Sequence, residues 1–147
     1  MLRARLALTD GNVPMRTVYL VSCVSKKIEG PAPARDLYCS DLFGKSRAIA
    51  ERAGGLWYIL SAKYGLLRPD EMITKYDKTL KTMGIADRRA WAAGVLQQLK
   101  GMLEPGDTVV MLAGEKYQEL LVPALEAAGI RVQDPMAGLK FGLRLRW

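Results

Sequence analysis

Residues 17–24, TVYLVSCV, decide the fold, because the run is short, apolar and rich in β-branched side chains. A run of this kind predicts a buried strand. Two similar runs, LWYILS at 56–61 and DTVVMLA at 107–113, predict further strands, and residues 130–132 predict a short one. The sequence therefore predicts a sheet of four strands.

Between these strands, apolar residues recur at spacings of three and four, which predicts helices over residues 40–54, 87–105 and 117–128. Ser40 and Asp41 can cap the first helix. Pro123 lies inside the third, where it should kink the helix or mark the point at which a second one starts. Alternation of strand and helix predicts an α/β fold with three layers, in which helices flank a mainly parallel sheet.

The 147 residues suffice for one domain with its own core. We expect residues 1–14 to be a loose extension and residues 15–147 to form a single α/β domain. The chain has no apolar run long enough for a membrane span and no pattern of a secretory signal. We therefore expect a cytoplasmic protein that does not associate with membranes, and nothing in the sequence implies a protein partner.

The chain contains no histidine, which excludes Ser-His-Asp and Cys-His catalytic arrangements. Its two cysteines, Cys23 and Cys39, do not form a C-x-x-C pair, so we expect no metal site and no cofactor. Chemistry must then depend on carboxylates, hydroxyls, thiols or lysines. The net charge of +7 favours a polyanionic partner, first of all nucleic acid, although a merely basic surface gives the same charge.

Two loops, over residues 22–35 and 61–80, follow the first two predicted strands and should open on the same edge of the sheet. Lysines and free backbone amides suit phosphates, and a tyrosine offers a flat partner to an unstacked base. We predict that a base is bound by Ser22, Cys23, Tyr38, Tyr64 and Tyr76. We predict that phosphates are bound by Lys26, Lys27, Lys63, Arg68 and Lys75.

Asp77 is the predicted catalytic carboxylate, with Asp36 and Asp70 as the next candidates. A carboxylate beside a sugar can activate water or stabilise the oxocarbenium-like state through which a glycosidic bond breaks. The alternative interpretation is that the tyrosines pack in the core and that the charges form a solvated face. Residues 136–147 have no acidic side chain, so they form either a further phosphate contact or a terminal strand.

Residues 60–80, LSAKYGLLRPDEMITKYDKTL, resemble the signature of the YaaA peroxide-stress family, an L-S-x-x-Y-G-L-L-x-P stretch followed by a P-Y pair. Here Lys75 replaces that proline, and Asp77 follows the tyrosine where the family has arginine. The chain is more similar to a group of short bacterial and phage proteins that combine this loop with three other motifs. These are S-C-x-x-K-x at 22–27, A-P-A-R-x-L-Y-x-S-x-L-F at 32–43, and a closing G-x-x-x-x-W at 142–147.

The resemblance implies a fold related to the uracil-DNA glycosylase superfamily, with a basic cleft for nucleic acid. A related domain accompanies enzymes that handle modified guanine in tRNA. By analogy at the level of the fold, proteins of this kind fit a role against phages whose DNA carries modified bases.

Our first hypothesis is a DNA glycosylase that hydrolyses the N-glycosidic bond of a flipped, modified base and leaves an abasic site. We expect DNA rather than RNA as the partner. In a variant of this hypothesis a lysine is the nucleophile and forms a Schiff base. The alternatives are a stress-response protein that binds nucleic acid without chemistry, and an enzyme that processes free nucleosides or nucleotides.

Overall fold

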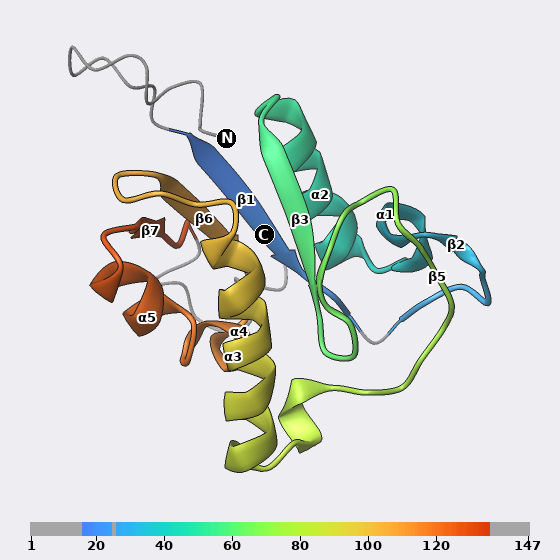
Figure 1. Ribbon diagram of the computed structural model, residues 1–147. Coiled ribbons are helices and arrows are strands. Elements are labelled where there is room, and N and C mark those ends of the chain that lie inside the picture. The colour runs from blue at the N-terminus through green and yellow to red at the C-terminus, as the bar shows by residue number, and fades with distance from the viewer. Residues whose placement is uncertain (1–15, 25, 136–147) are drawn as a thin grey trace.

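The computed structural model describes residues 16–24 and 26–135, which form a main sheet with helices on both faces and a second, two-stranded sheet (Figure 1). The sheet has five strands in the order β4-β3-β1-β6-β7. Four of them are parallel, namely β1 (Thr17–Ser22), β3 (Leu56–Ser61), β6 (Thr108–Leu112) and β7 (Arg131–Gln133). The predicted α/β fold and mainly parallel sheet are confirmed. The expected extension over residues 1–14 and the basic stretch 136–147 lie outside the described residues.

The prediction of four strands is wrong by one, because β4 (Gly65–Leu67) adds an antiparallel edge strand beside β3. A strand of three residues is too short to show a period in the sequence. The amide of Gln98 covers this edge: its Oε1 accepts a hydrogen bond from the Leu66 amide at 3.0 Å, and its Nε2 donates to the Leu66 carbonyl at 3.4 Å.

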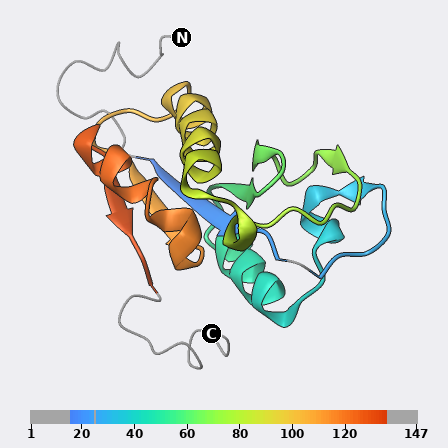
Figure 2. The ribbon, with the colours of Figure 1, turned by 90° about the horizontal axis from the view of Figure 1, so that it is seen from below.

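β1 is the central strand and is buried on both faces, since alternate side chains belong to two different cores. Val21 packs on the side of α2 (Asp41–Arg52), where Phe43 is buried. Val18 and Leu20 pack on the opposite side against α3 (Ile85–Lys100) and α5 (Val122–Ala127). The two cores confirm the three layers, and Figure 2 shows them from below. None of the described helices is long and apolar enough to cross a membrane.

The predicted helix boundaries were right at the cap of α2 and at the proline of α5, whereas α3 ends earlier than predicted. The Ser40 hydroxyl accepts a hydrogen bond from the Phe43 amide at 3.1 Å and caps α2 as expected. The third predicted helix is divided into α4 (Glu115–Gln118) and α5, and Pro123 lies in the first turn of α5, so the predicted restart is confirmed. α3 begins two residues earlier than predicted and ends at Lys100, before Pro105.

The loops after β1 and β3 contain short elements that the sequence did not predict. The first loop contains β2 (Ala32–Pro33) and α1 (Ala34–Leu37), and the second contains β5 (Met72–Ile73) and the 3-10 helix η2 (Leu80–Thr82). Most apolar side chains of the second loop are buried, as expected of an ordered loop, whereas Met72 is 62% exposed. Both loops are therefore folded parts of the domain.

Candidate functional site

The loops after β1 and β3 join each other directly at the carboxyl edge of the sheet. β2 pairs with β5 in antiparallel fashion, Ala32 opposite Ile73 and Pro33 opposite Met72. The amides of Ala34 and Arg35 donate hydrogen bonds to the carbonyls of Glu71 and Pro69, at 2.8 and 2.9 Å. The two segments in which the sequence placed the site therefore form one paired unit.

Cys23 and Ser61 stand side by side at this edge, where β1 and β3 end. The Cys23 amide donates to the Leu60 carbonyl at 2.9 Å, which extends the pairing of the two strands by one residue. The Cys23 thiol lies 3.0 Å from the hydroxyl of Tyr117, a residue of α4 in the connection after β6. The connections of β1 and β6 lead to opposite sides of the sheet, so this contact lies at a topological switch point, where ligands of such sheets bind.

Three buried side chains, Tyr38, Ser61 and Tyr76, share hydrogen bonds and are here named the hydroxyl cluster. The hydroxyl of Tyr76 lies 2.7 Å from that of Ser61 and 2.6 Å from that of Tyr38. Tyr38 and Tyr76 are only 4% and 7% exposed, and Ser61 is fully buried. The cluster thus joins the end of β3 to a residue from each of the two loops.

The direction of one of these hydrogen bonds follows from counting protons. The Ser61 oxygen accepts from the amides of Lys63 and Tyr64, at 3.2 and 3.0 Å, which occupies both of its lone pairs. Its own proton must then be donated to Tyr76. The hydroxyl of Tyr76 therefore acts as an acceptor toward Ser61, and the turn after β3 sets the direction of this hydrogen bond.

The phenols at this edge stay neutral. Burial raises the pKa values of Tyr38, Tyr76 and Tyr117 well above the ordinary value, and the neighbouring Cys23 thiol raises them further. These groups consequently act as hydrogen-bond donors and acceptors and carry no charge in the physiological range.

Two lysines approach the aromatic rings of the site. Lys27 Nζ lies 4.4 Å from the centre of the Tyr76 ring and 5.8 Å from that of Tyr38. Lys63 Nζ lies 5.2 Å from the centre of the Tyr64 ring, which meets the Tyr76 ring edge to face at 5.5 Å. Tyr64 is 36% exposed, so its ring is available at the surface next to the hydroxyl cluster.

The other predicted phosphate ligands do not gather at this point. Lys75 pairs with Glu29 at 3.3 Å, and Arg68 pairs with Asp70 at 3.6 Å on the surface. Lys26 is exposed, and its carbonyl accepts a hydrogen bond from the Cys39 amide at 3.0 Å. Of the predicted basic residues, the structure brings Lys27 and Lys63 to the aromatic rings.

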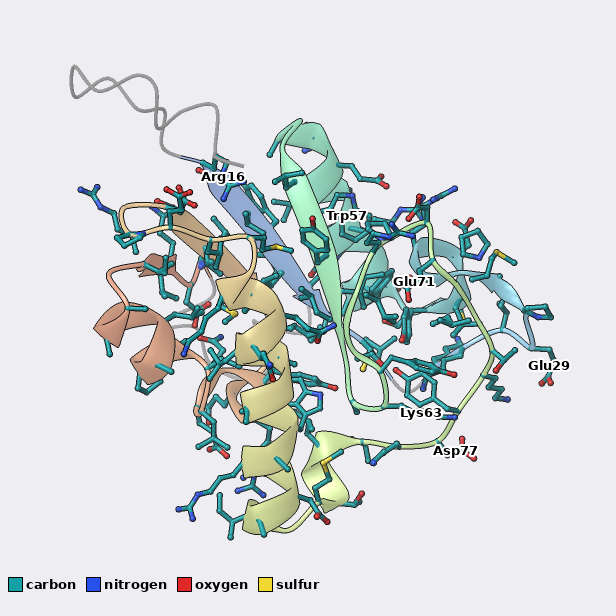
Figure 3. The ribbon with its side chains drawn as sticks, in the orientation of Figure 1. Arg16, Glu29, Trp57, Lys63, Glu71 and Asp77 are labelled. Carbon is teal, nitrogen blue, oxygen red and sulfur yellow. The ribbon has the colours of Figure 1, made fainter. Side chains whose placement is uncertain are left out.

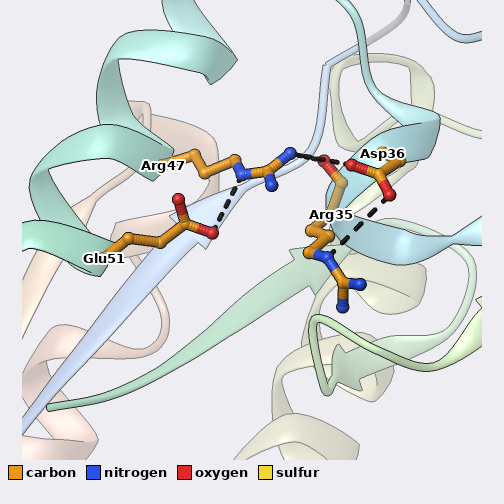
Figure 4. A network of polar contacts seen from close by, with 4 residues as sticks. All are labelled: Arg35, Asp36, Arg47 and Glu51. Atoms are coloured by element: carbon orange, nitrogen blue, oxygen red, sulfur yellow. Dashed lines mark hydrogen bonds and ion pairs between the residues drawn. The ribbon is translucent and has the colours of Figure 1, made fainter. Parts of the chain in front are cut away.

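The three predicted carboxylates all lie outside the hydroxyl cluster. Asp36 belongs to a surface network in which its oxygens lie 3.0 Å from Arg47 Nη1 and 3.8 Å from Arg35 Nε (Figure 4). Burial lowers the pKa of Arg47, but its hydrogen bonds to Asp36 and Glu51 outweigh this and raise it overall. Asp36 therefore ties α1 to α2.

Asp77 directly follows Tyr76 on the exposed side of its loop (Figure 3). Among the side chains that the structure describes, Asp77 makes no ion pair, in contrast to Asp36 and Asp70. The described residues contain no group of three or more cysteines and carboxylates that could hold a metal ion.

Two further residues of the site are Trp91 and Tyr117, for which the helical spacing of their segments predicted only a place in the core. Trp91 of α3 donates from its indole nitrogen to the Ser61 carbonyl at 2.8 Å. Its ring meets that of Tyr117 edge to face at 5.6 Å, and Tyr117 in turn reaches Cys23. A buried indole or phenol needs a hydrogen-bond partner, so the polar atoms of Trp91 and Tyr117 were the signal in the sequence that these residues do more than pack.

Comparisons with known proteins agree with the extent of this domain. A family model described as a family of unknown function, DUF6884, matches residues 18–147. A Bacillus subtilis (strain 168) protein described as "Uncharacterized protein YfjM" is 32% identical over 117 residues, which cover 73% of this chain and 75% of that protein. No solved structure matches the chain. Since the family model spans the sheet from β1 onward and both loops of the site, this chain belongs to the DUF6884 family.

Proposed function

We propose that this chain is a DNA glycosylase, which binds nucleic acid at the carboxyl edge of the sheet and hydrolyses the N-glycosidic bond of an unstacked base. One observation carries the proposal: β2 and β5 pair the two loops, which gathers neutral hydroxyls, an exposed aromatic ring and lysines at the switch point of the sheet. Such a set matches the needs of a base, which combines a flat ring, polar edges and a neighbouring phosphate.

In this proposal the base stacks on Tyr64, whose ring is exposed, and its polar edge turns toward the hydroxyl cluster. Lys63 beside Tyr64 binds a flanking phosphate. The groups that would contact the base lie close together at one site. This favours a base that has left the duplex, because the target atoms of a stacked base are covered by its neighbours.

The proposed catalytic carboxylate is Asp77. It adjoins Tyr76 in the chain, is exposed and makes no ion pair among the described side chains. A carboxylate there activates water and stabilises the oxocarbenium-like sugar. Asp36 and Asp70 are less suited, since arginines already neutralise them.

The resemblance of the loop 60–80 to the YaaA family supports the same proposal, because it implies a fold of the uracil-DNA glycosylase superfamily. The expected substrate is a modified base, and phage DNA is a rich source of such bases. A role in defence against phages follows by analogy with the fold.

The test is incubation of the purified protein with genomic DNAs that differ in base modification, followed by mass spectrometry of the released bases. We expect one class of DNA to release a base and to acquire alkali-labile abasic sites. Asp77→Asn should reduce the rate by at least about 100-fold, whereas Asp70→Asn, an exposed and ion-paired control, should retain it. The absence of any released base would refute the proposal.

A second candidate, binding without chemistry, is favoured by the position of all three carboxylates outside the hydroxyl cluster. It predicts an affinity for DNA that falls steeply with salt, and no product from any substrate. Lys63→Gln should then reduce the affinity and the salt slope, while Lys75→Gln, a control lysine paired with Glu29, should change them less.

A further inference from the structure

The proposed reaction also needs a side chain that stabilises the departing base. When a glycosidic bond is hydrolysed, negative charge develops on the base nitrogen. A group that stabilises this charge in the transition state accelerates the reaction. The sequence has no histidine, and the phenols of the hydroxyl cluster are neutral and buried.

We propose that Lys27 is a further catalytic residue, whose ammonium group contacts the departing base and neutralises its developing charge. This inference rests on the proposed glycosylase function. Lys27 acts on the departing base, whereas Asp77 acts on the water and the sugar.

The first argument is the position of Lys27. Its Nζ lies 4.4 Å from the centre of the Tyr76 ring, and the Tyr64 ring meets that same ring edge to face. The base that stacks on Tyr64 is therefore brought toward the same ring that holds the ammonium group. Lys63 stands over Tyr64 itself and is exposed, which suits a phosphate contact.

The second argument is that the backbone of Lys27 is held in place. Lys27 forms an antiparallel bridge with Tyr38, and the flanking bonds Cys39 N to Lys26 O and Ile28 N to Leu37 O measure 3.0 and 2.9 Å. A charge that is already in position needs no reorganisation as the transition state forms. Lys100, an exposed lysine at the end of α3 to which no role at the site is assigned, provides the control.

The third argument is the contact between the Lys27 ammonium group and two aromatic rings. The faces of tyrosine rings attract a cation, so this lysine is suited to electrostatic stabilisation at the site.

The proposed step is balanced. The oxygen of water bonds to C1′ of the sugar and transfers one proton to the Asp77 carboxylate, while the C1′–N bond breaks and leaves both electrons on the base. Lys27 stabilises this base anion without losing its own proton. The base then takes up a proton from solvent as Asp77 releases one, so the products are the free base and an abasic site.

The experiment varies the leaving base and the lysine together. Oligonucleotides carry one deoxyuridine with a 5-fluoro, 5-hydrogen or 5-methyl group, a series in which the base becomes a steadily poorer leaving group. Single-turnover rates of base release are measured for the wild type, Lys27→Met, Lys27→Arg and the control Lys100→Met. Binding of each protein to an oligonucleotide with a stable abasic analogue reports folding and DNA affinity.

We expect Lys27→Met to slow release by about 10-fold for the fluorinated base and by about 100-fold or more for the methylated one, whereas binding to the abasic analogue changes little. Lys27→Arg should restore part of the rate, and Lys100→Met should match the wild type. An equal loss on all three bases, or no loss, would overturn the role of Lys27 while the glycosylase stands. If the wild type releases none of these bases, the proposed function fails on them and the inference fails with it.

Discussion

The hydroxyl of Tyr76 lies 2.7 Å from that of Ser61 and 2.6 Å from that of Tyr38, so a single phenol joins β3 to both loops of the site. Tyr76 is buried, and Ser61 has to donate its proton to it because backbone amides occupy the serine lone pairs. The hydrogen bonds of this one residue thus affect both the stability of the domain and the geometry of the site.

Replacement of Tyr76 by phenylalanine should therefore cost more than the loss of an average hydrogen bond. The Ser61 hydroxyl and the Tyr38 hydroxyl would both lose a buried partner, for a total of about 2–4 kcal/mol of unfolding free energy. Urea unfolding monitored by fluorescence measures this. Tyr64→Phe is the matched control, because Tyr64 is partly exposed, and it should cost less than about 1 kcal/mol. An equal effect of the two variants would contradict the assigned cluster.

The buried phenols predict a loss of stability at alkaline pH. The folded-state pKa values of Tyr38, Tyr76 and Tyr117 exceed the unfolded value of about 10. Stability is thus complete below about pH 10 and falls as the pH rises above it, because the unfolded state releases these protons first. Each phenol steepens the fall by up to about 1.4 kcal/mol per pH unit. Tyr117→Phe should reduce the slope by this amount between pH 10 and 11, and an unchanged slope would argue against its burial as a neutral group.

The environment of Asp107 predicts that the stability of the domain depends on pH in the acid range. Burial alone would raise the pKa of its carboxyl, but the amides of Glu104 and Arg16 and the Arg16 guanidinium outweigh this and lower it. The resulting stability is present above the unfolded pKa of about 4 and is lost as the pH falls through the lower folded value. Asp107→Asn should cost about 2 kcal/mol at pH 7 and progressively less below pH 4.

Urea unfolding at pH 7 and pH 3 measures the difference between Asp107→Asn and the wild type. Asp70→Asn, at an exposed ion pair, should change the stability by less than about 1 kcal/mol at both values. A cost for Asp107→Asn that stays constant with pH would show that its role is packing and not charge.

Replacement of two glycines by alanine should change the stability of the domain in opposite directions. Gly65 begins β4 with a φ of +76°, and a Cβ atom there would lie 3.0 Å from the Oε1 of Gln98 that binds the edge strand. Gly65→Ala should destabilise the domain by about 1–2 kcal/mol. Gly94 lies in α3 with open space around its Cα, so Gly94→Ala should stabilise by up to about 1 kcal/mol. Thermal unfolding of the two variants compares them directly, and a shift of the same sign in both would contradict this assignment.

How far the sequence predicts this fold depends on the length of each element. β1 and β3 are buried on both faces, so their runs are apolar throughout and easily recognised. Pro123 marks the start of α5 because its missing amide is tolerated there. β2, β4 and β5 have only two or three residues each. β4 pairs with the preceding strand β3, whereas the pairing of β2 with β5 depends on contacts between segments far apart in the sequence.

The candidate site was predictable in its residue types and less so in its geometry. Tyrosines in the two loops were expected at the site, but which of them would be buried could not be read from the sequence. Tyr38 and Tyr76 pack in the core, as the alternative interpretation had it, and Tyr64 stays partly exposed. The ion pair of Asp36 with Arg47 likewise depends on the placement of α1 beside α2, so the sequence alone did not separate this carboxylate from Asp77.

The pairing of β2 with β5 has a consequence for how this domain can change. Because the two loops share backbone hydrogen bonds, neither can adopt a new conformation while the other keeps its own. Loop exchange between relatives should therefore succeed only when residues 26–39 and 62–80 are transplanted together, and a single transplanted loop should yield a poorly folded chimera. The two loops thus form one structural module, although β3 and a helix separate them along the chain.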